Sequence, residues 1–126
     1  MSSLHLFEAY GIELEYMIVQ KDDLSVLPLS DIVLQEAAHH LTTEVELGEI
    51  AWSNEFVLHV IELKTNGPRT SLDRLSFLFH EHIRKINSIL GPHRGRLIPT
   101  GAHPLMDPHK ETRLWPHEYN QIYETY

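Results

Sequence analysis

The sequence predicts an α+β fold, in which helices cover one face of a largely antiparallel sheet. Three features support this prediction: an early run that alternates between apolar and polar residues, two later apolar runs, and a long helical stripe after them. The 126 residues also match the usual length of one domain. We therefore expect residues 1–126 to form a single domain.

The first predicted strand covers residues 6–19. Apolar residues occupy the even positions from Ile12 to Ile18, while Glu13 and Glu15 occupy odd positions. Because successive side chains of a strand alternate between its faces, both glutamates should project from the same face. The stretch KDDLSVLPLS then indicates a turn. Leucine and alanine recur at helical spacing after it, which predicts a short helix over residues 31–42.

Two further strands and the longest helix follow. EVELGEIAWSNEF predicts one strand and VLHVIELKTNG another, with a turn at SNE between them and a stop at Asn66-Gly67-Pro68. Apolar residues then recur in steps of three and four from Leu72 to Leu90, which predicts a helix. Thr70 should cap its start, and Gly91-Pro92 should end it. GRLIPTGAHP predicts a short strand that runs into a loop.

Composition and charge exclude several classes of function. The net charge of −8, with histidine neutral, disfavours a nucleic-acid surface, which needs excess positive charge. The absence of cysteine excludes disulfides, thiolate nucleophiles and zinc–thiolate sites. No apolar stretch approaches the ~20 residues of a membrane helix, and no secretory leader is recognisable. We therefore expect a cytoplasmic protein that binds neither nucleic acid nor a membrane.

Glutamates on the predicted strands are the first candidates for chemistry. On a buried face Glu13 and Glu15 would need a proton, a cation or a metal ion, whereas on a solvated face they would need no partner. Glu62 lies within the apolar run VIELKT, where a solvent-facing position is harder to accept. Glu55 would reach Glu62 only from the turn or through a bulge. Carboxylates gathered from several strands would suit Mg²⁺ or Mn²⁺.

Histidines are the second group of candidates. His103 is the most suggestive, because Gly101 and Pro104 shape its loop, although an ordinary surface position is the alternative. His39-His40 and the pair His80 and His82 lie on predicted helices, and we interpret them as solvated. The sequence contains no glycine-rich phosphate loop, nucleophile elbow or HExxH motif.

Several motifs follow one another in a recognisable order: GIELEYMIV, NEFVLHVIELKT, an L-x-x-L-x-x-x-F helix, PTGAHPLMDP and a tyrosine-rich segment. From about Leu6 to Tyr126 they resemble the glutamate–cysteine ligase type 2 family, carboxylate–amine ligases of the glutamine synthetase superfamily. The resemblance implies the N-terminal segment of a longer, glutamine synthetase-like catalytic domain. It also implies that ATP activates a carboxylate, typically that of glutamate, as an acyl phosphate, which an amine then attacks.

The resemblance further implies a set of site residues and partners. The implied metal ligands are Glu13, Glu15, Glu55, Glu62 and His103. The expected substrate-binding residues are Lys64, Thr65 and His103. Mg²⁺ or Mn²⁺ is the implied cofactor and ATP the co-substrate, with a small carboxylate and an amine as the other substrates. We expect a homo-oligomer, and no catalytic residue is assigned.

One departure from the family and two alternative functions remain. The family usually has an arginine before the tyrosine that follows its His-Pro motif, whereas here Glu118 precedes Tyr119, so the substrates stay open. The family's later histidine-containing strand and phosphate-facing cations are expected beyond Tyr126, so this chain alone could be an inactive fragment. A non-catalytic module could instead self-associate through sheet edges or exposed apolar surface. A metal-dependent hydrolase is less favoured, because no water-activating triad is visible.

Overall fold

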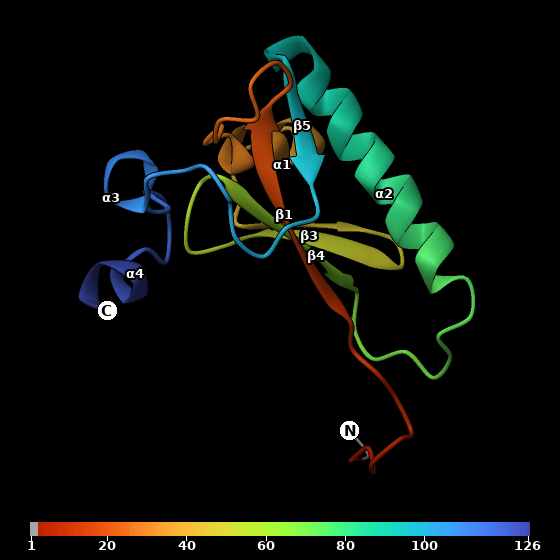
Figure 1. Ribbon diagram of the computed structural model, residues 1–126. Helices are drawn as coiled ribbons and strands as arrows, with labels where there is room; N and C mark the ends of the chain where they lie inside the picture. Colours follow the sequence, from red (N-terminus) through yellow and green to blue (C-terminus); the bar gives the residue numbers. More distant parts are fainter. Residues whose placement is uncertain (1–2) are drawn as a thin grey trace.

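The computed structural model describes residues 3–126. Within this range the strands form one five-stranded antiparallel sheet in the order β2–β3–β4–β1–β5, and the longest helix lies along one side of it (Figure 1). The strands are β1 (Glu13–Gln20), β2 (Glu44–Leu47), β3 (Ile50–Asn54), β4 (Val60–Thr65) and β5 (Gly95–Ile98). The helices are α1 (Ser30–Ala38), α2 (Leu75–Leu90), α3 (Pro108–Glu111) and α4 (Gln121–Thr125), with a 3-10 turn η1 (Gly91–His93). This architecture confirms the predicted α+β class.

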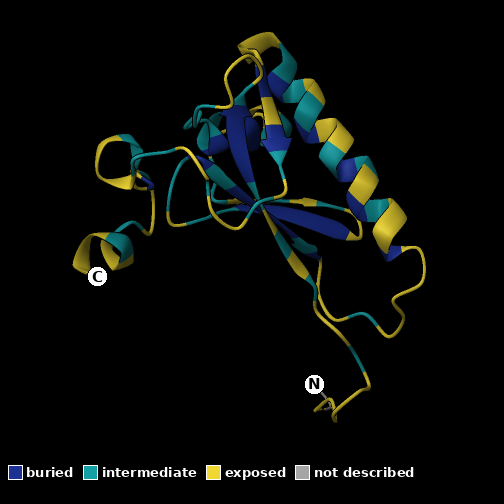
Figure 2. Ribbon diagram, in the orientation of Figure 1, coloured by how far each residue is buried: buried dark blue, intermediate teal, exposed yellow. Residues whose placement is uncertain are grey.

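One face of the sheet forms the hydrophobic core beneath α1 and α2. Alternate side chains of β1, β3 and β4 point to this face, so that Ile18, Trp52 and Ile61 pack against Leu34 of α1 and Ile86 of α2. Each of these side chains is at most 1% exposed. Burying one side chain of this size contributes roughly 1.5–3 kcal/mol, so this layer is the main source of stability. Figure 2 shows the buried sheet and the alternation of buried and exposed residues along α2.

The opposite face of the sheet is divided into two parts. Toward β5, Met17 and Val19 are buried, and Thr100 from the segment after β5 lies against Met17, with Oγ1 3.8 Å from Sδ. Toward β2, the same face carries mainly charged and polar side chains, including Glu15 and Glu62. This acidic part of the sheet positions the candidate site.

The first strand is shorter than predicted, because β1 begins at Glu13 and not near Leu6. Glu13 is the last β1 residue that pairs with β4, opposite Lys64. Phe7, at φ 67°, lies in the left-handed region and interrupts any extended run before it. Leu6 and Phe7 are 87% and 82% exposed, so they do not belong to the core.

EVELGEIAWSNEF forms two strands, so the prediction of a single strand was wrong. β2 and β3 form a hairpin in which Leu47 pairs with Ile50 and the turn lies at Gly48 and Glu49. Gly48 adopts φ 77°, a conformation that glycine reaches without steric cost. The turn predicted at SNE lies later in the chain, because Ser53 and Asn54 still belong to β3, and the connection covers residues 55–59 before β4 starts at Val60.

Both main helices differ from prediction at one end. α1 stops at Ala38, short of the predicted residue 42, because His39 turns into the left-handed region at φ 63°. α2 begins at Leu75 after Arg74 at φ 61°, so Thr70 does not cap it. Its end at Leu90 is as predicted. No helix in the described range combines the length and apolar character needed to cross a bilayer.

Candidate functional site

Three glutamates from separate parts of the sheet converge on its acidic face. Glu15 lies on β1 and Glu62 on β4, directly opposite each other in the strand register. Glu55 follows the end of β3. One carboxylate oxygen from each of the three lies within 4.8 Å of the others. We call Glu15, Glu55 and Glu62 the carboxylate cluster.

The β3–β4 connection explains how Glu55 reaches Glu62. Ser53 pairs with Glu62 across the two strands, so their side chains share a face. Glu55 lies two residues beyond Ser53 and continues on that face as the chain enters the loop. The sequence predicted that Glu55 could reach Glu62 only from the turn or through a bulge. In the structure Glu55 lies in the turn, and the two carboxylates come together.

Glu62 is the most enclosed member of the carboxylate cluster. It is 8% exposed, and its Oε1 accepts a hydrogen bond of 2.9 Å from the Ser53 hydroxyl. Lys64 Nζ lies 3.4 Å from the same oxygen and 2.7 Å from a carboxylate oxygen of Glu44. Burial lowers the pKa of Lys64, but these two carboxylates outweigh burial, and the pKa is raised overall. Lys64 is therefore a cation that Glu44 and Glu62 share.

The charges around Glu55 are not balanced. Burial raises the pKa of Glu55, and the nearby carboxylates of Glu62 and Glu15 raise it further. The Phe56 N–H opposes this shift, because it donates to Glu55 Oε2 at 3.2 Å. The net pKa shift is upward, as expected where like charges meet without enough cations. Lys64 alone does not neutralise the cluster.

The carboxylate cluster fits a small divalent cation. Octahedral Mg²⁺ binds oxygens at about 2.0–2.1 Å, which places adjacent ligand oxygens about 3 Å apart and opposite ones about 4.2 Å apart. The cluster oxygens lie within 4.8 Å of one another, a limit somewhat wider than these ligand spacings, so the carboxylates would have to close in around an ion. An all-oxygen, anionic donor set is also the one that Mg²⁺ and Mn²⁺ prefer.

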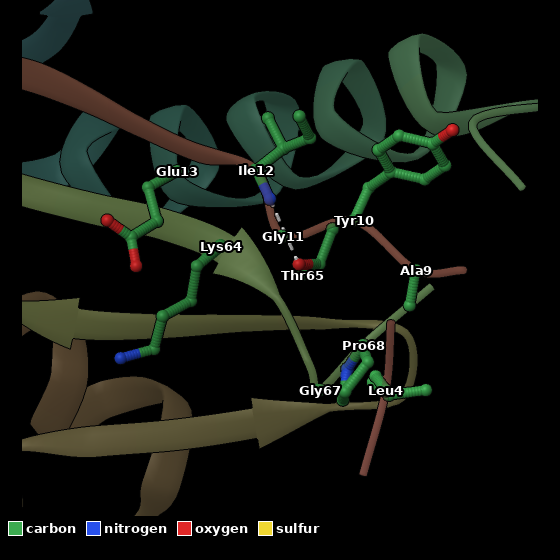
Figure 3. Close-up of a pocket in the computed structure, with 10 residues that line it drawn as sticks. All are labelled: Leu4, Ala9, Tyr10, Gly11, Ile12, Glu13, Lys64, Thr65, Gly67 and Pro68. Atoms are coloured by element: carbon green, nitrogen blue, oxygen red, sulfur yellow. Dashed lines mark hydrogen bonds between the residues drawn. The ribbon is translucent and has the colours of Figure 1, made fainter. Parts of the chain in front are cut away.

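Glu13 lies outside the carboxylate cluster, although it shares the face. Glu13 is exposed and pairs across the strands with Lys64. Figure 3 shows the Glu13 and Lys64 side chains extending to the same side, at the edge of a hollow of about 260 Å³. Thr65 also lines this hollow, and its hydroxyl accepts a 3.2 Å hydrogen bond from the Ile12 N–H. Lys64 therefore borders both the hollow and the cluster.

His103 is held by its own loop and is not brought to the carboxylate cluster. Its Nδ1 accepts hydrogen bonds from the N–H groups of Leu105 and Met106, at 3.1 and 3.0 Å. This leaves the proton on Nε2, which donates to the Leu24 carbonyl. Because both ring nitrogens are engaged with backbone groups, His103 fixes the path of the loop after β5.

Three contributions were not identified from the sequence. Ser53 and Glu44 hold Glu62 and Lys64. The only signal for Glu44 was the alternation of glutamates along β2, and Ser53 had no signal beyond being polar near the end of β3. His82 was predicted to be solvated but is 5% exposed, and its Nδ1 accepts from Trp52 Nε1 at 2.9 Å. His82 lies on the buried side of α2, where it supplies the hydrogen-bond acceptor that the buried Trp52 indole requires. His80 is exposed, as predicted.

The chain is similar to known proteins over most of its length. Residues 9–126 match the sequence model of glutamate-cysteine ligase family 2 (GCS2). An uncharacterized protein of Archaeoglobus fulgidus is similar to this chain, with 28% identity over 116 residues. The aligned region covers 92% of this chain and 31% of that protein. The chain therefore spans less than a third of the length of this relative.

Proposed function

The chain belongs to glutamate-cysteine ligase family 2, and from this membership we propose that it provides the metal-binding acidic face of an ATP- and Mg²⁺-dependent carboxylate–amine ligase. The observation that supports the proposal best is the convergence of Glu15, Glu55 and Glu62. A divalent cation held there would offset the negative charge of ATP and of the phosphoryl group in transfer. The substrates would be a small carboxylate, with glutamate the first choice, and an amine.

The three glutamates would contribute differently. Glu62 is the fixed ligand, since burial, the Ser53 hydroxyl and the Lys64 ammonium restrict its carboxylate. Glu15 is exposed, so its carboxylate is free to adjust to the ion. Glu55 lies on a loop and completes the set from the side opposite β1 in the strand order.

The hollow beside the carboxylate cluster is the proposed place for the carboxylate substrate. Glu13, Lys64 and Thr65 line it, and Lys64 also contacts Glu62, so a substrate there would lie next to the bound ion. A ligand carboxylate would compete with Glu44 for the Lys64 ammonium. His103 would act indirectly, by holding the loop after β5.

Metal binding tests the proposal directly. Isothermal titration calorimetry of the full chain with Mn²⁺ should show binding to the wild type and much weaker binding to Glu62→Gln. The loss of Mn²⁺ affinity in Glu62→Gln should be larger than the roughly 10–100-fold loss that follows removal of a residue that only supports a metal ligand. Glu46→Gln is the matched control, because it removes the same charge from exposed β2 without touching the cluster. Equal affinities for wild type and Glu62→Gln would contradict the proposal.

Self-association through the sheet edges is less favoured than the ligase function. Both edge strands, β2 and β5, are only four residues long. Glu44 and Glu46 on β2 and Arg96 on β5 are exposed charges, and charged, short edges resist pairing with another chain. A homo-oligomer would therefore form through other surfaces, which sedimentation at several concentrations can test.

A further inference from the structure

The loop that carries Glu55 is held from outside by residues 113–123, here called the clamp segment. Two backbone hydrogen bonds, of 2.9 and 3.1 Å, join residues 56–58 to residues 113–115 around an isolated antiparallel bridge. The Trp115 side chain, only 1% exposed, anchors the clamp segment in the core. The loop is thus supported by a part of the chain about 60 residues away in sequence.

Tyr123 contacts the residues on both sides of Glu55. Its ring meets the Phe56 ring edge-on, with the ring centroids 5.4 Å apart. Its hydroxyl oxygen accepts from Asn54 Nδ2 at 3.4 Å, and the same nitrogen donates to the Glu55 carbonyl at 3.2 Å. Phe56 in turn donates its N–H to Glu55 Oε2. One side chain therefore contacts both neighbours that hold the backbone and carboxylate of Glu55.

We propose that Tyr123 is a positioning residue that keeps Glu55 in the carboxylate cluster. β3 ends at Asn54, so strand hydrogen bonds no longer fix the chain at Glu55. Repulsion from Glu15 and Glu62 favours a Glu55 carboxylate turned outward into water. The contacts of Tyr123 oppose that movement, because they fix Asn54 and Phe56. This inference rests on the proposed function, in which the place of Glu55 matters for binding the cation.

A double-mutant cycle on Mn²⁺ affinity tests whether Tyr123 acts through Glu55. Tyr123→Ala should weaken Mn²⁺ binding about 10-fold, as loss of a supporting partner of a metal site does, and Glu55→Gln, which removes a proposed ligand, should weaken it at least as much. In the Glu55→Gln background, Tyr123→Ala should have no further effect. Tyr123→Phe keeps the ring contact and should restore most of the affinity. Ile122→Ala, an exposed change on the same helix, should leave the affinity unchanged.

Hydrogen exchange of the Phe56 N–H in the metal-free chain gives a second readout. It should become faster in Tyr123→Ala and stay unchanged in Ile122→Ala. If the wild type binds no Mn²⁺ but this exchange responds, the proposed function fails and the positioning of Glu55 by Tyr123 stands. If the wild type binds Mn²⁺, two results would overturn the inference. One is an unchanged affinity in Tyr123→Ala, and the other is a double variant in which the affinity losses of Tyr123→Ala and Glu55→Gln add. Should Tyr123→Ala not fold, Tyr123→Leu replaces it in each measurement.

Discussion

Glu15 and Glu62 lie directly opposite each other on antiparallel strands, a like-charged pair in the middle of a sheet. Such pairs destabilise a sheet, and the Lys64 ammonium at 3.4 Å relieves only the Glu62 side. A cation bound as proposed would balance the remaining charge. Stability and metal binding should therefore respond in opposite directions when the pair is changed.

Glu15→Gln should stabilise the metal-free chain and weaken its response to metal. Removing one of two facing like charges should raise the free energy of unfolding by about 0.2–1 kcal/mol without metal. The increase in this free energy caused by Mn²⁺ should shrink, because one ligand is missing. Urea unfolding with and without Mn²⁺ measures both effects, with Glu46→Gln as the control. A loss of metal-free stability in Glu15→Gln would contradict the expectation.

Mn²⁺ should stabilise the wild-type chain reversibly. A cation that binds only the folded state at 100 times its Kd adds about 2.7 kcal/mol to the free energy of unfolding. Thermal unfolding should therefore shift to higher temperature with Mn²⁺, and excess EDTA should reverse the shift. Glu62→Gln, measured in parallel, should show little change. A shift of the same size in this variant would mean that the ion binds elsewhere.

Acid should weaken the core at His82. Burial lowers the pKa of His82, the nearby Lys85 charge lowers it further, and Glu81 acts in the opposite direction. The unfolded chain, with the ordinary histidine pKa of about 6.5, therefore binds more protons than the folded chain. The stability that neutral His82 supports is present above about pH 6.5 and is lost as the pH falls below it.

The measurement is urea unfolding between pH 7.5 and pH 5. The wild type should lose more stability over this range than His82→Gln, which has no imidazole to protonate. His80→Gln is the matched control, because His80 is exposed on the same helix. Its free energy of unfolding should change with pH as that of the wild type does. Parallel slopes for wild type and His82→Gln would remove His82 as the cause.

Gly48→Ala should destabilise the β2–β3 hairpin. At φ 77° a Cβ costs roughly 1–2 kcal/mol, and no atom beyond the two chain neighbours lies within 4 Å of the position the Cβ would take, so the cost is conformational. Gly101→Ala is the control, since that site also has open space and no left-handed φ. Chemical denaturation of both variants gives the comparison, and equal stabilities would show that the turn adapts.

The sequence predicted the order of the main elements but not all their ends. The stripe from Leu75 to Leu90 is long and regular, so helical periodicity alone identified α2. The start of β1 and the end of α1 were missed, because they depend on left-handed residues such as Phe7 and His39. Residues other than glycine seldom adopt this conformation, and nothing in the local sequence marks it.

Three of the five predicted metal ligands come together in the structure, whereas the supporting contacts of Glu44, Ser53 and Tyr123 were not predicted. Glu15 and Glu62 were identified because a charged residue is conspicuous in an apolar strand. Tyr123 was not identified from the sequence, because its contact with Asn54 joins parts of the chain that are 69 residues apart. Contacts between distant segments depend on the tertiary fold, which periodicity and local motifs do not encode.

The loop position of Glu55 has a consequence for how such a site can change. Paired strands set the spacing of Glu15 and Glu62, so neither can move without altering the sheet register. The third oxygen sits on the β3–β4 connection, where insertions and substitutions are tolerated far better. If the carboxylate cluster holds a cation as we propose, a change in ionic radius or coordination number would be accommodated by remodelling that connection alone.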